Sequence, residues 1–226
     1  MTVLLVLATF IALIAVSFAV RSLRASDSTR IPAAAAAKGG LNVADFRLPK
    51  GVFFHPGHTW AALQPEGNVK VGLDDFIQQL IRPIHEIIPP EIGTEVDQGA
   101  PLFTLQVDSQ HLVIPAPISG RILSVNRDLL ARLPLAERTN LTSQWVVNFQ
   151  PGNLQEELTG LPIAAKAKEW LRREFERLVE FLESQSARPE LAGQTLQDGG
   201  EPVLGVLHIL DDEGIKQFEN EFLKSS

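Results

Sequence analysis

The sequence contains no cysteine, which removes disulfides, thiolate metal sites and cysteine nucleophiles together and is compatible with a reducing compartment. Basic residues are also few, with 20 Lys and Arg against 27 Asp and Glu and a net charge of −7. No basic block and no stripe of alternating basic and aromatic residues occurs, which argues against a nucleic-acid partner. Glycine-rich phosphate loops of the dinucleotide or Walker kind are missing as well.

Lysine is absent from the middle of the chain, where none occurs between Lys70 and Lys166. This gap contains a predicted β-hairpin. Alternating apolar residues in 102–107 and the apolar run 112–114 form its two arms, and the polar stretch 108–111 forms its tip. The tip therefore offers no side-chain amine for covalent attachment of a group.

The N-terminal residues are largely apolar, and 2–20 carry no charge. As a helix this run would span about 28 Å, close to the hydrocarbon thickness of a bilayer. It could be a signal peptide or an anchor. No basic residue precedes it, whereas Arg21, Arg24 and Arg30 follow. These flanks predict an uncleaved transmembrane helix over 1–22, with the C-terminal bulk on the cytoplasmic side.

Residues 23–48 are predicted to form a flexible tether. They contain an alanine run between Pro32 and Gly39, which confines any helix to about two turns, too short to be stable alone. The following residues, 49–152, show short strands separated by Gly, Pro and Asn turns, a pattern typical of an all-β sandwich or barrel.

A short helix is predicted inside this β pattern. Asp74 and Asp75 open a segment with apolar residues at helical spacing, and Pro83 limits its extension. Residues 84–88 then resume as a strand before Pro89.

Several short motifs in residues 50–152 follow the order and spacing of one known family. They are His58-Thr59-Trp60-Ala61, residues 67–76, residues 89–96, Ala116-Pro117-Ile118-Ser119-Gly120 and Val125-Asn126. In these motifs the chain resembles the H protein of the glycine cleavage system, a lipoyl carrier. The resemblance implies a mainly β fold, a flattened barrel-sandwich hybrid with an inserted short helix, and a structural role for the residues matching His58 and Trp60.

The same resemblance implies where a lipoyl group would be attached. The family's lipoylated lysine precedes the alanine of the Ala-Pro-x-Ser-Gly run by seven residues, which corresponds to Ser109, and Gln106 stands where the family has glutamate. A serine hydroxyl cannot form the amide that joins lipoate to a lysine. We therefore expect no lipoyl cofactor in this domain.

Other polar residues suggest sites but favour structural roles. His55 and His58 resemble a metal pair, yet Pro56-Gly57 breaks any helix between them and no further ligands are evident. Asp74 and Asp75 could serve in acid–base chemistry, although helix capping is the favoured interpretation.

A hydrolytic triad is suggested by Ser109, His111 and Asp108. Three such residues within four positions seldom reach the geometry of nucleophile, base and orienter, and no Gly-x-Ser-x-Gly motif surrounds the serine. We expect no catalytic residue, no metal site and no enzyme activity.

The final segment, 153–226, is predicted to be a helical extension. Apolar residues recur at helical spacing from Ile163 to about Ser184, which predicts an amphipathic helix that packs on the β domain, on another protomer or on a partner. Residues 203–210 are apolar enough for a buried strand or extended segment. Asp211 or Asp212 is expected to cap a last helix.

Three hypotheses about function remain from the sequence. The first is a membrane-anchored, non-lipoylated H-like domain that acts as a protein-binding or scaffold module, with an unidentified protein partner. The alternative is a lipoyl carrier of the glycine cleavage system that shuttles an aminomethyl group. A hydrolase or metalloenzyme is the third and least supported hypothesis.

Overall fold

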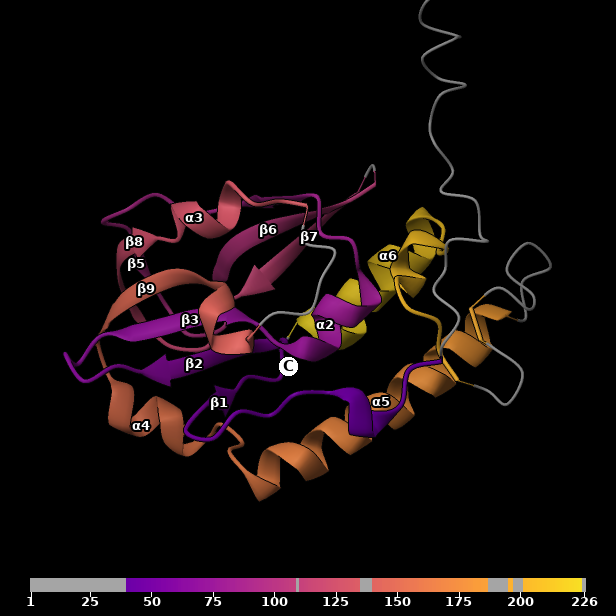
Figure 1. Cartoon of the computed structure of the whole chain (residues 1–226), viewed down its shortest axis with the longest axis horizontal. Helices are drawn as coiled ribbons and strands as arrows, with labels where there is room; N and C mark the ends of the chain where they lie inside the picture. The colour runs from indigo at the N-terminus through magenta and orange to yellow at the C-terminus, as the bar shows by residue number, and fades with distance from the viewer. Residues whose placement is uncertain (1–39, 109, 135–139, 187–194, 197–200, 225–226) are drawn as a thin grey trace, which may run out of the picture. The chain divides into compact units, whose positions relative to one another are not determined.

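The computed structural model describes residues 40–108, 110–134, 140–186, 195–196 and 201–224 (Figure 1). The predicted transmembrane helix over 1–22 and most of the predicted tether lie outside the described residues. No helix in the described part of the chain has the length and hydropathy needed to cross a bilayer.

Two antiparallel sheets form the centre of the described domain (Figure 1). One sheet has six strands in the order β1 (Phe53–Phe54), β2 (Thr59–Leu63), β3 (Val69–Leu73), β9 (Trp145–Pro151), β8 (Gly120–Val125) and β5 (Glu95–Val96). The other has three strands in the order β4 (Glu86–Ile88), β6 (Pro101–Val107) and β7 (Gln110–Pro115). The predicted mainly β sandwich is confirmed.

The barrel part of the fold prediction is not matched, because the sheets stay open. The edge strands β1 and β5 have two residues each, and no described strand pairs them with one another. Pro89 and Pro90, which cannot donate backbone hydrogen bonds, separate β4 from β5. Side chains from both sheets nevertheless fill one core, among them Val71, Leu105 and Phe149.

The predicted short helix is α2 (Asp75–Leu80), and all six of its residues are buried. Its N-cap is Asp74, whose Oδ1 accepts a hydrogen bond from the Ile77 N–H at 2.9 Å. Aspartate caps a helix because it satisfies an amide that has no partner in the first turn. Around the sandwich lie four further short helices, α3 (Arg127–Leu130), η3 (Leu141–Gln144), α4 (Leu154–Thr159) and η2 (Val43–Asp45).

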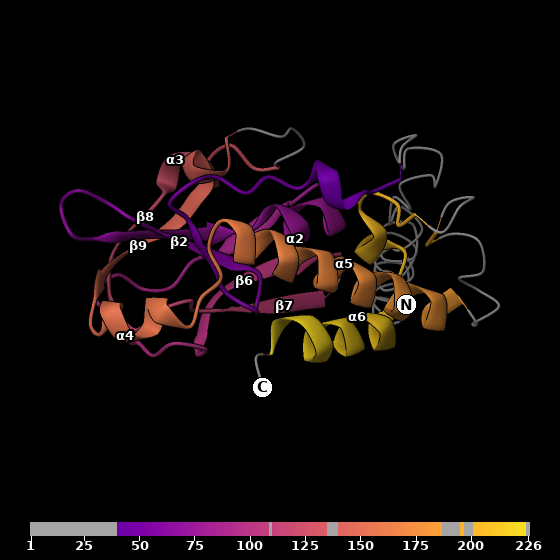
Figure 2. The same ribbon diagram turned by 90° about the horizontal axis from the view of Figure 1, so that it is seen from below.

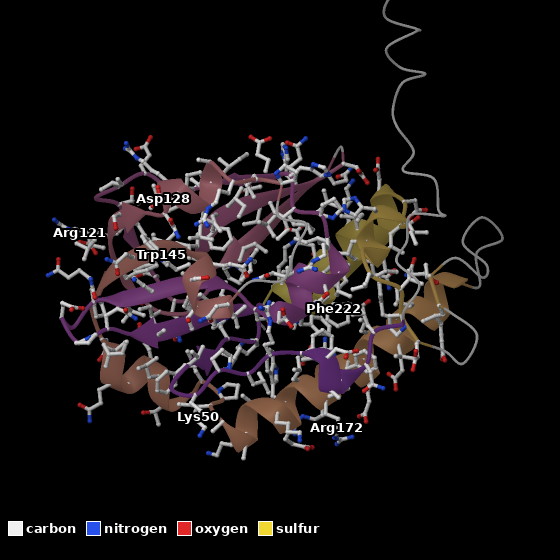
Figure 3. All side chains as sticks on the ribbon, in the orientation of Figure 1. Lys50, Arg121, Asp128, Trp145, Arg172 and Phe222 are labelled. Atoms are coloured by element: carbon white, nitrogen blue, oxygen red, sulfur yellow. The ribbon has the colours of Figure 1, made fainter. Side chains whose placement is uncertain are left out.

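The amphipathic helix is α5 (Ala165–Ser186), and its apolar face packs on the β domain of the same chain (Figure 2). Trp170 lies 6.3 Å from Phe54 of β1 between ring centroids. On the opposite face, Arg172 pairs with Glu169 and Glu176 and points to solvent (Figure 3). The sequence left three surfaces on which this helix could pack: its own β domain, another protomer or a partner. In the structure it packs on its own domain.

The C-terminal extension ends in η4 (Val206–His208), α6 (Asp212–Phe218) and η5 (Glu219–Leu223). The expected strand over 203–210 is wrong, although Val203, Val206 and Leu207 are buried. Gly205 has φ of 69°, which turns the chain into a short helix where an extended segment was expected. The capped last helix is confirmed, since Asp211 Oδ1 accepts from the Gly214 N–H at 2.7 Å.

Residues 40–48, the described end of the predicted tether, have fixed contacts and differ from that prediction. Leu41 and Phe46 are buried, and the Leu41 N–H donates to Pro202 O at 2.7 Å. The ring of Phe46 lies 5.5 Å from that of Phe76 on α2. Two isolated apolar residues show no periodicity, so the sequence pattern gave no sign of this packing.

Candidate functional site

The β6–β7 hairpin contains position 109, where the family resemblance would place a lipoyl group. Gln106 pairs with His111 and Val107 with Gln110, so Asp108 and Ser109 connect the strands. Asp108 has φ of 51°, a conformation that aspartate tolerates in tight turns, and its carbonyl accepts from Gln106 Nε2 at 3.1 Å. Ser109 itself lies outside the described residues.

The hairpin tip is joined to the C-terminal extension. Asp108 Oδ2 lies 3.0 Å from Nδ1 of His208, and His208 Nε2 lies 3.0 Å from the carbonyl oxygen of Ile81. A carboxylate and a carbonyl are both acceptors, so both contacts are hydrogen bonds only when each ring nitrogen carries a proton. A third contact, from the Gly205 N–H to Gln79 O at 2.9 Å, attaches the same turn to α2.

This contact was not predicted from the sequence. His208 stands within an apolar segment that was expected to be a strand, and a hundred positions separate it from Asp108. The contact is weak in energy, because the Asp108 side chain is 62% exposed and exposed ion pairs contribute about 0–1 kcal/mol.

A lipoyl group does not fit the residues of this hairpin. Attachment as an amide requires a primary amine, and no lysine occurs between Lys70 and Lys166. In the described part of the chain, the side chain that contacts the tip from the C-terminal extension is that of His208, which is an imidazole and not a primary amine.

The predicted capping and packing residues form a buried polar group beneath α5. His58 is fully buried with φ of 61°, its ring stacks on Phe76 at 4.4 Å, and its Nδ1 lies 2.8 Å from Asp74 Oδ2. Its Nε2 lies 3.9 Å from Oε2 of Glu174 on α5. Asp74 thus caps α2 and contacts His58, and Asp75 pairs with Arg47.

Arg177 completes this group by pairing with Glu174, at 2.7 Å between Nη1 and Oε2. Its guanidinium lies 4.9 Å from the ring centroid of Phe222, and its Nη2 donates to Glu221 O at 2.7 Å. Figure 3 shows Phe222 beside α2, where its ring is 6.3 Å from that of Phe76. The extension is thus joined to the β domain by charged as well as apolar contacts.

His55 does not share a site with His58. It is buried, and its Nδ1 accepts a hydrogen bond from the Gly57 N–H at 3.0 Å. Burial, with the nearby His58 as a second cause, lowers the pKa of His55 from 6.5 to about 4. Within the described ranges, no cluster of three or more His, Asp or Glu is arranged to hold a metal ion.

Of the residues considered for a hydrolytic triad, Ser109 lies outside the described residues, and no hydrogen bond joins the described Asp108 and His111. Asp108 pairs with His208, and His111 is exposed on β7 opposite Gln106.

Comparison with known proteins identifies the domain. The sequence model of the glycine cleavage H-protein family matches residues 52–174, which extends beyond residue 152 into α5. A probable glycine cleavage system H protein of Pyrococcus abyssi is 30% identical over 132 residues, covering 58% of this chain and 98% of the relative. The glycine cleavage system H protein of Hydrogenovibrio crunogenus is 28% identical over 109 residues, covering 48% of this chain and 84% of the relative.

Among solved structures, the H protein of Mycobacterium marinum matches with 21% identity and a TM-score of 0.46, covering 54% of this chain and 95% of that protein. The family's sequence model covers more than half of the 226 residues. The chain therefore belongs to the glycine cleavage H-protein family.

Proposed function

We propose that this chain is a membrane-anchored, non-lipoylated H-like domain that binds another protein. The observation that carries the proposal is the lack of any lysine between Lys70 and Lys166, a range that includes the whole β6–β7 hairpin. Without an amine there is no covalent lipoyl arm, and without the arm no aminomethyl group is carried.

The contact between the hairpin tip and the extension supports this proposal. A carrier arm has to move between partners, whereas Asp108 is paired with His208, whose ring also contacts Ile81 O. The tip is thereby held against the molecule's own C-terminal segment. Such an arrangement suits a surface of fixed shape better than a mobile attachment point.

The outer face of the three-stranded sheet is the proposed binding surface. Ile88, Thr104 and Val113 are paired in register across β4, β6 and β7. Ile88 is 43% and Val113 36% exposed, and the two apolar side chains lie on one face of the sheet with Thr104 between them. Exposed apolar side chains that share one sheet face are typical of protein contact sites when polar residues surround them.

The alternative function is that of a lipoyl carrier of the glycine cleavage system. The names of the relatives favour it over a scaffold role, because the matched proteins are described as glycine cleavage system H proteins. Attachment chemistry separates the two functions.

Expression with lipoate ligase and lipoate, followed by intact mass measurement, decides between them. The proposal expects no lipoyl adduct on the wild-type chain. Ser109→Lys supplies an amine at the family's position, and the Pyrococcus abyssi relative serves as a positive control. An adduct on the wild-type chain would establish the carrier function.

The binding role is tested separately by affinity capture from solubilised membranes. Ile88→Glu with Val113→Glu places two charges on the proposed surface and is expected to abolish capture of a reproducible partner. Leu63→Glu, at a residue that is 51% exposed on β2, is the matched control. Equal capture by all three proteins would refute the assigned surface, and no reproducible partner would refute the binding role.

A further inference from the structure

A hollow of about 780 Å³ opens on the part of the domain beside α4. Its wall comes from three segments far apart in the sequence: the turn before β2 with His55 and Pro56, the loop before β6 with Gln98, and α4 with the following Leu161. This volume lies in the range of small-ligand sites, which is about 300–1,000 Å³. Neither proposed function uses this region.

The wall of the hollow is held by internal hydrogen bonds. Glu157 Oε2 accepts from the Ser119 N–H at 2.8 Å. The backbone N–H of Gln98 donates to Ser119 Oγ at 2.9 Å, and its side-chain Nε2 donates to Pro117 O at 2.9 Å. Because these bonds connect α4 and the Gln98 loop to the same Ser119 turn, the two walls are fixed relative to each other.

The charge of the lining favours a cation. Its titratable side chains are Glu156, Glu157 and His55, and none of the described residues that line it is Lys or Arg. Burial holds the pKa of His55 near 4, so its ring is neutral at pH 7. Two carboxylates therefore remain without a cationic neighbour in the lining.

His55 adds a hydrogen-bond donor to this acidic wall. The side chain is buried, with 4% of its surface exposed, and lines the hollow. Since Nδ1 accepts from the Gly57 N–H, the proton of the neutral ring is on Nε2. Among the described residues, no hydrogen-bond partner faces Nε2. This N–H is not one of the buried polar atoms that lack a partner, so it is accessible from outside the core and can donate to an acceptor that a ligand brings.

We propose that this hollow binds the free amino terminus of a peptide. Its ammonium group pairs with the carboxylates of Glu156 and Glu157, and a nearby carbonyl oxygen accepts the Nε2–H of His55. Pro56 and Leu161 supply apolar wall for a small first side chain. This site is independent of the β6–β7 hairpin and of the function proposed for it.

The test is calorimetric titration of the whole chain with alanyl-alanine amide, N-acetyl-alanyl-alanine amide and propylamine at low salt. We expect saturable binding of alanyl-alanine amide with a dissociation constant below about 1 mM, and at least about tenfold weaker binding of the other two. In the same complex the ¹⁵N resonance of His55 Nε2 should shift.

Glu156→Gln with Glu157→Gln removes the charges while keeping an acceptor for the Ser119 N–H, and is expected to weaken binding by about tenfold or more. The control, Glu66→Gln with Glu183→Gln, makes the same change in net charge at exposed positions elsewhere and should leave affinity unchanged. Equal binding of the acetylated peptide or of propylamine, an unaffected double variant, or no saturation up to about 10 mM would overturn the proposal.

Discussion

At the scale of single residues, the burial of His55 and the close packing around Gly205 affect the stability of the fold. His55 is neutral in the folded protein because burial disfavours its charged form, which lowers its pKa to about 4. In the unfolded chain the same side chain titrates near 6.5. Below that pH the unfolded state binds a proton that the folded state excludes.

Acid should therefore destabilise the protein through His55. The free energy of unfolding is expected to fall as the pH drops from about 6.5 to about 4, by up to about 3 kcal/mol. His55→Asn retains an acceptor for the Gly57 N–H and should reduce this slope. Urea unfolding at several pH values measures it, with exposed His111→Asn as the control. An unchanged slope in His55→Asn would contradict the assignment.

Gly205 is needed at the turn into η4, because this turn has no space for a side chain. Its φ is 69°, and an added Cβ would lie 2.5 Å from Arg82 O. Gly205→Ala should lower the free energy of unfolding by about 2–4 kcal/mol, from backbone strain and overlap together.

The control for this substitution is Gly51→Ala. Gly51 has a similar φ of 73° but nothing within 4 Å of an added Cβ, so about 1 kcal/mol of backbone strain is expected there. Equal losses in the two variants, measured by urea unfolding, would show that the overlap with Arg82 contributes nothing.

At the scale of elements, α5 joins the extension to the sandwich through a buried apolar face. Leu178 on its inner face is fully buried, whereas Arg173 on its outer face is exposed. Leu178→Ala should lower the free energy of unfolding by about 2–5 kcal/mol through the cavity it leaves, and Arg173→Ala by less than about 0.5 kcal/mol. Similar small effects at both positions would mean that α5 is not docked in solution.

The hairpin and η4 interact through the exposed Asp108–His208 pair. A double-mutant cycle with Asp108→Asn and His208→Gln should give a coupling energy below about 1 kcal/mol, because the carboxylate is 62% exposed. The backbone of residues 106–111 should nevertheless become more mobile in both single variants, as measured by amide ¹⁵N relaxation. Unchanged relaxation would argue that the pair does not position the tip.

At the scale of the whole molecule, the sequence predicted what is local or periodic. The hairpin arms, the Asp74 cap, α5 and the Asp211-capped helix all follow from spacing and capping chemistry. The burial of Leu41 and Phe46, the turn at Gly205 and the Asp108–His208 contact depend on residues far apart in the chain. No local pattern records such contacts, which is why they appeared only with the structure.

The membrane anchor belongs to the same scale and remains a proposal on residues 1–22. The full chain is expected to stay in the membrane pellet after alkaline carbonate washing, because an apolar run of this length partitions into the bilayer. Deletion of residues 1–22 should release it to the supernatant. Release of the full chain by the wash would contradict a transmembrane helix.

The most direct test of the central claim is the intact mass of the native protein, extracted from the membranes of cells that produce it. The account predicts the mass of the unmodified 24.8 kDa chain, apart from processing of its first methionine. A mass increased by one lipoyl group would contradict it and assign the protein to the carriers of the glycine cleavage system.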